Sequence, residues 1–152
     1  MLDITLLAVG KIKDKNLSAL AQEYLKRLRP FARLKVVELP AVAFSSALQT
    51  KAKELEGEKI ENFLEKNPDA LCYLLSERGE MFDSLTFATW LEKKSPLILV
   101  IAGSLGFSPF LVKKYPKLSL SALTFPHELA RVILLEQIYR AATILQHKNY
   151  HY

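Results

Sequence analysis

Five apolar residues lead directly into a glycine-containing loop in the segment Leu97-Ile98-Leu99-Val100-Ile101-Ala102-Gly103-Ser104-Leu105-Gly106. An apolar run without polar alternation predicts a strand covered on both faces, as in parallel sheets flanked by helices. A loop of small residues beyond the carboxyl end of such a strand lies where α/β sheets open a crevice for a ligand. The segment therefore predicts an α/β fold with a small-molecule site after residue 101.

The rest of the chain alternates strand and helix patterns around this segment. Predominantly apolar segments predict strands over residues 4–9, 70–75 and 97–101, an alternating pattern predicts a strand over 34–39, and a fifth, short strand is predicted over 118–122. Helical periodicity and capping signals at Asn16, Ser46 with Gln49, and Ser108-Pro109 predict helices between these strands, followed by a last helix over 127–146. This alternation predicts a single three-layer α/β domain over residues 1–152 with a mostly parallel sheet.

Size, charge and cysteine content restrict the class of protein. The chain has 152 residues, half of them hydrophobic, which suits a globular domain with a real core. A net charge of +5 permits an anionic partner such as RNA. The lone Cys72 cannot form an internal disulfide, and no metal-ligand spacing is present. Without a signal-peptide pattern or an apolar run of roughly 20 residues, we expect a cytoplasmic protein with no membrane segment and no metal.

A second candidate ligand segment follows the strand predicted over 118–122. Backbone groups of residues 121–126 could hydrogen-bond the edge of an adenine, with Leu123 and Phe125 as apolar walls. The same residues also suit an ordinary turn, in which Pro126 simply fixes the start of a helix. The glycines of the first loop suit either close approach of a ligand or tight packing. The residues alone leave these alternatives open.

The last predicted helix and the tail carry polar features that suit a nucleic acid. The helix is apolar on more than one side, so it is either deeply buried or faces a second subunit, and we favour a homodimer. His127 and Arg131 are four residues apart, as are Glu136 and Arg140, which predicts either surface pairs or arginines that bind phosphate. The tail from 146 to 152 mixes basic and aromatic residues, which suits single-stranded RNA, although chain termini usually fray.

The chain resembles a known family in the segments 4–13, 23–27, 97–106, 118–127 and 131–141, and in Tyr150-His151. Together they resemble the bacterial ribosomal RNA large subunit methyltransferase H family, in order and in spacing, over nearly the whole chain. The resemblance implies a SPOUT-class methyltransferase, which is an α/β domain with a C-terminal trefoil knot that works as a homodimer. Such a knot is an exception to the usual rules of chain topology.

The resemblance also implies an activity and a cofactor. Members of this family use S-adenosylmethionine to methylate N3 of a pseudouridine in the 23S rRNA of the assembled ribosome. Carried over by position, the cofactor-binding residues would be Leu75, Gly103, Ser121, Ala122, Leu123, Thr124, Phe125 and Pro126. The alternative is a non-catalytic RNA-binding or ribosome-associated factor of the same fold. Ala102 motivates it, because the family commonly has a glycine there.

Methyl transfer from a sulfonium needs an in-line nucleophile and no metal, so its catalysis is mainly positioning. Because N3 of pseudouridine carries a proton, we expect a base at some stage, with His151 as the first candidate and His127 as the second. Arg131 or Arg140 would hold phosphate or stabilise a developing oxyanion. The expected RNA contacts are Arg140, His147, Lys148 and Tyr150.

Overall fold

The computed structural model describes all residues from 1 to 152 and is built on one parallel sheet. Its strands are β1 (Leu2–Val9), β2 (Ala32–Leu39), β3 (Leu71–Met81), β4 (Leu97–Ile101) and β5 (Lys117–Ser119). They lie in the order β2-β1-β4-β3-β5, and every neighbouring pair is parallel. The carboxyl ends of the strands therefore gather at one edge of the sheet, as the sequence predicted.

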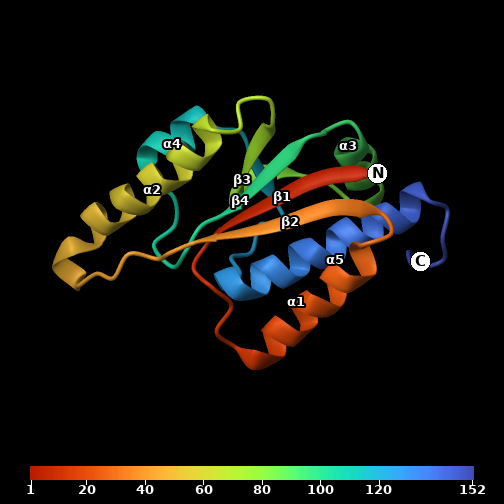
Figure 1. Ribbon diagram of the computed structural model, residues 1–152, viewed down its shortest axis with the longest axis horizontal. Coiled ribbons are helices and arrows are strands. Elements are labelled where there is room, and N and C mark those ends of the chain that lie inside the picture. The colour runs from red at the N-terminus through yellow and green to blue at the C-terminus, as the bar shows by residue number, and fades with distance from the viewer.

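Helices cover both faces of this sheet (Figure 1). On one face lie α1 (Lys15–Leu28), α3 (Ser84–Glu92) and α5 (His127–Leu145); on the other lie α2 (Gln49–Glu65) and α4 (Pro109–Lys114). Successive strand residues point to opposite faces. Leu6 accordingly joins the core under α5, while Leu7 joins the core under α2. The predicted three-layer α/β domain is confirmed.

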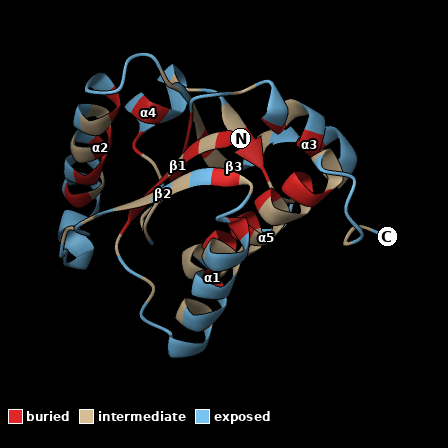
Figure 2. Cartoon of the chain, turned by 45° about the vertical axis from the view of Figure 1, so that its right-hand side comes forward, coloured by how far each residue is buried: buried red, intermediate tan, exposed pale blue.

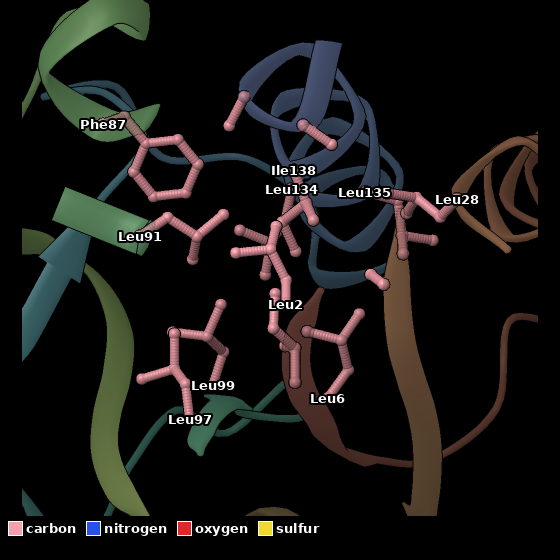
Figure 3. Close-up of a cluster of buried hydrophobic side chains, with 14 of the residues drawn as sticks. Leu2, Leu6, Leu28, Phe87, Leu91, Leu97, Leu99, Leu134, Leu135 and Ile138 are labelled. Atoms are coloured by element: carbon pink, nitrogen blue, oxygen red, sulfur yellow. The ribbon is translucent and has the colours of Figure 1, made fainter. Parts of the chain in front are cut away.

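The larger core lies between the sheet and α5. Figure 3 shows Leu134 and Ile138 of α5 close to Leu2 and Leu6 of β1, and all four are buried. Burying a leucine side chain fully contributes about 1.5–3 kcal/mol. Figure 2 shows the buried side of α1 and α5 turned toward the sheet and the exposed side turned toward solvent. The last helix of the chain is thus packed on its first strand.

Several element boundaries differ from the sequence prediction. Asp14, and not Asn16, caps α1, because its side chain accepts a hydrogen bond from the Leu17 amide at 2.9 Å. The predicted capping box at Ser46 is wrong, since a short 3₁₀ turn over Ser46–Leu48 precedes α2 and no side chain caps it.

The strand predicted over 70–75 starts at Leu71, which is 45% exposed, so it is covered less completely than predicted. It continues to Met81, whereas β5 ends at Ser119 and not at 122. β3 pairs with β5 in parallel, and the register shifts between Leu75 and Glu80. A Cβ on Gly79 would lie 2.6 Å from the backbone carbons of Lys117 and Leu118, so glycine permits the close approach of the two strands within this irregularity. No helix of the structure is long and apolar enough to span a bilayer.

Candidate ligand site

A cavity of about 630 Å³ lies beyond Ile101, at the carboxyl end of β4. Its walls come from residues 75–78 of β3, from the loop 102–107 and from the segment 120–127 that joins β5 to α5. This volume lies within the range of small-molecule sites, which combine apolar walls with a few polar groups. Leu75 and Phe125 supply apolar surface, and the serine- and glycine-containing loops supply backbone donors and acceptors.

The cavity brings together the two loops that the sequence singled out. All the predicted cofactor-binding residues except Ala122 line it, namely Leu75, Gly103, Ser121, Leu123, Thr124, Phe125 and Pro126. Ala122 is exposed and lies between two lining residues. The first loop is therefore not an isolated turn but one wall of a site shared with the second.

Gly103 serves packing and the cavity at once. A Cβ at this position would lie 3.2 Å from Cγ1 of Val9, so the absence of a side chain lets the loop lie against β1. Gly106 has φ +76°, and its amide donates to the Gly103 carbonyl at 3.1 Å, which closes a tight turn. Tight packing of the loop is therefore observed, and Gly103 also lines the cavity.

Hydrogen bonds fix the segment that joins β5 to α5. The Ser119 hydroxyl lies 2.8 Å from the carbonyl oxygen of Ser121, and the Ser121 hydroxyl accepts from the Leu123 amide at 3.1 Å. Pro126 precedes the first helical residue, and its carbonyl accepts the Ala130 amide at 2.9 Å. This segment thus presents its backbone to the cavity in a defined conformation.

The structure places only one of the three predicted catalytic residues in the cavity. His127 lines it, at the start of α5. His151 lines a neighbouring cavity of about 450 Å³, and its Nδ1 lies 3.3 Å from the Arg140 guanidinium. Arg131 is 4% exposed and donates to Glu38 at 2.8 Å and to the Gly10 carbonyl at 2.9 Å. Its expected pairing with His127 is not formed, because the arginine turns inward to the ends of β1 and β2.

The tail folds back on α5. The Tyr150 hydroxyl donates to Glu136 at 3.1 Å, and its ring centroid lies 4.8 Å from the Arg140 guanidinium carbon. The predicted pair of Glu136 with Arg140 is present at 2.7 Å. Burial, together with the Glu136 carboxylate, raises the pKa of the Tyr150 hydroxyl above its usual range. Two of the expected RNA contacts, Arg140 and Tyr150, therefore have partners within the chain.

Several polar residues of this region were not predicted from the sequence. Lys53, Arg78 and Lys117 also line the cavity, each from a different strand or helix. Glu56 of α2 is 4% exposed, and its Oε2 accepts from the Val42 amide at 2.9 Å, while Oε1 has no partner. No local motif could have revealed them, because their positions depend on how α2 and β3 pack.

The fold and the cavity define an α/β protein whose ligand site is built from loops at the ends of parallel strands. A family model described as "Predicted SPOUT methyltransferase" matches residues 2–151, so the chain belongs to the SPOUT methyltransferases. Within that class it belongs to the ribosomal RNA large subunit methyltransferase H family, which confirms the resemblance in the sequence.

The individual relatives span the whole chain. The ribosomal RNA large subunit methyltransferase H of Kosmotoga olearia is 38% identical, with 99% of this chain and 100% of its own length covered. The Clostridium kluyveri protein of the same name is 39% identical, with 99% of each chain covered. A crystal structure of a Bacillus anthracis protein assigned as an RNA methyltransferase has a TM-score of 0.56 at 13% identity, covers 92% of this chain and 94% of its own, and shares the fold.

Proposed function

We propose that this protein transfers a methyl group from S-adenosylmethionine to N3 of a pseudouridine in the 23S rRNA of the assembled ribosome. The observation that carries the proposal is the cavity that unites Gly103 with Ser121–Pro126 at the strand ends. Its apolar walls suit an adenine ring, and its backbone groups suit the hydrogen-bonding edge of that ring. The relatives that cover the whole chain carry the name of an rRNA methyltransferase.

The proposed cofactor supplies an electrophilic methyl group on a sulfonium. The chain would hold it between Leu75 and Phe125 and against the backbone of the 121–126 segment, away from bulk water. His127 is the histidine of the cavity that could accept the N3 proton, and His151 in the adjoining cavity is the second candidate. Arg131 would act as a positioning residue, since it ties α5 to the ends of β1 and β2.

Single-turnover methylation at several pH values distinguishes the two histidines. We expect His127→Ala to lower the rate by about 10²–10⁴-fold, the usual size of a general-base contribution. His151→Ala would lower it less, because His151 lies in the adjoining cavity. Wild-type rates in both variants across the pH range would rule out a histidine as the base.

We further propose that the active form is a cytoplasmic homodimer whose C-terminal third forms a trefoil knot. Exposed apolar side chains support a second subunit, because Met81 is 58% and Leu85 is 54% exposed beside the smaller cavity. A substrate within the ribosome would place the reaction in the cytoplasm.

The proposed function is tested with assembled ribosomes that lack the modification. The protein and S-adenosylmethionine are added, the RNA is digested, and mass spectrometry searches for N3-methylpseudouridine. We expect one new methylated pseudouridine in 23S rRNA. If a folded protein and competent ribosomes give no product, calorimetric titration with S-adenosylmethionine tests the alternative, because a non-catalytic factor would show no saturable binding.

A further inference from the structure

Three cations surround the cavity without any carboxylate partner. Lys53 comes from α2, Arg78 from β3 and Lys117 from the start of β5. The four ion pairs of the structure involve other residues, and the Lys117 ammonium has only the Tyr115 carbonyl at 3.4 Å. The single acidic residue of the lining is Glu77. The cavity therefore has an excess of positive charge that the chain itself does not neutralise.

The cations Arg140 of α5 and Lys148 of the tail differ from these three because each already has a partner within the chain. The Arg140 guanidinium is held by Glu136 through two hydrogen bonds, at 3.0 and 2.7 Å. The Lys148 ammonium lies 4.8 Å from the centre of the Phe31 ring. The side chains at the cavity, unlike that arginine, are free to bind an anion from outside the chain.

We propose that Lys53, Arg78 and Lys117 bind backbone phosphates of the RNA strand that carries the target nucleotide. This inference rests on the proposed function. A base that accepts a methyl group must come within about 3–3.5 Å of it, so the phosphates on either side of that base pass the mouth of the same cavity. An arginine can grip a phosphate with two parallel hydrogen bonds, and lysines add point charges.

The cofactor alone does not explain these three cations. S-adenosylmethionine has one carboxylate, but its sulfonium and ammonium give it a net positive charge, which three further cations would repel. A strand of RNA carries one negative charge per nucleotide, so a bound strand would offset the positive charge of the cavity. Leu123, which is 71% exposed at the cavity, adds apolar surface on which an unstacked base can lie.

The test compares Lys53→Gln, Arg78→Gln, Lys117→Gln and the triple variant with Lys93→Gln. Lys93 is an exposed control that follows α3 and precedes β4, away from the cavity. For each protein, the Kd for unmodified ribosomes is measured at several salt concentrations, and the Kd for S-adenosylmethionine is measured by calorimetry. Arg78→Lys keeps the charge and is expected to bind ribosomes more tightly than Arg78→Gln does.

We expect each cavity variant to weaken ribosome binding several-fold and not to weaken cofactor binding, since the cations it removes repel the positively charged cofactor. The slope of log K against log salt should fall by about 0.7 for each phosphate of a single strand that the variant no longer binds. A triple variant with wild-type ribosome affinity and salt slope would overturn the inference, as would a weakening confined to cofactor binding. If the wild-type protein forms no methylated product, the proposed function fails, and the ribosome-binding data still test the phosphate contacts.

Discussion

The Cys72 thiol, on a strand between two helical layers, illustrates how one side chain responds to its surroundings. Burial raises its pKa to about 12, and the nearby Glu61 carboxylate adds to the effect. Because the thiolate is the nucleophile, we expect negligible alkylation by iodoacetamide at pH 8 in the folded protein and full alkylation in urea. Intact mass spectrometry gives the extent of reaction. Equal rates in both states would contradict the burial of this thiol.

The buried carboxylate of Glu56 gives a second prediction for a single residue. Glu56→Ala leaves the Val42 amide without its acceptor, so we expect it to lower the free energy of unfolding by about 1–3 kcal/mol. Glu56→Gln keeps an acceptor oxygen and should cost less. Urea unfolding of both variants provides the comparison. An equal effect in the two would mean that the charge, and not the hydrogen bond, stabilises this position.

The positions of individual site residues could be predicted only where a local sequence pattern indicates them. Gly103 and the 121–126 segment follow strands that the sequence predicts. Their place at the carboxyl edge of the sheet could therefore be inferred. Lys53 and Arg78 follow no motif and reach the cavity through tertiary packing. Arg131 was expected to face outward beside His127, but the carboxylate of Glu38 draws it inward.

At the level of elements, the paired strands β3 and β5 approach each other closely at Gly79. Gly79→Ala would place a methyl group 2.6 Å from backbone carbons that no side-chain rotation can relieve. We expect a loss of stability of several kcal/mol or failure to fold, as overpacking against rigid neighbours costs about 1–3 kcal/mol or more. Gly106→Ala is the matched control, since its site is open and only its φ of +76° is strained. Thermal unfolding that ranks Gly106→Ala as the worse variant would contradict this account.

The presence of each strand was predictable, and the strand ends were not. All five strands were located from the sequence, although only the first half of β3, residues 71–75, was predicted, because burial selects apolar residues only where a strand is covered. The end of β3 was missed because residues 76–80 are polar or glycine, although Glu80 and Met81 still pair with Leu118 and Ser119 of β5. The true cap of α1 was missed because Asp14 and Asn16 are both good caps, and only the path of the chain selects between them.

For the whole molecule, the assembly state is the most direct test. We expect sedimentation equilibrium at micromolar concentration to give twice the 17.3 kDa mass of one chain, because Met81 and Leu85 would otherwise remain exposed. Leu85→Glu should shift the protein toward the single-chain mass while leaving its circular dichroism unchanged. A single-chain mass for the wild-type protein would remove the support for a dimer.

The packing of α5 on β1 also has a consequence for how the protein is made. Leu134 and Ile138 cover strand residues near the start of this chain, so the core on this face stays incomplete until residues 127–145 have been synthesised (Figure 3). A nascent chain emerges from its N-terminus, and Leu28 of α1 and Leu91 of α3 reach this core long before α5 does. Leu2, Ile4 and Leu6 therefore stay only partly covered until α5 has been made, and this strand is where we would look for chaperone contact with the growing chain.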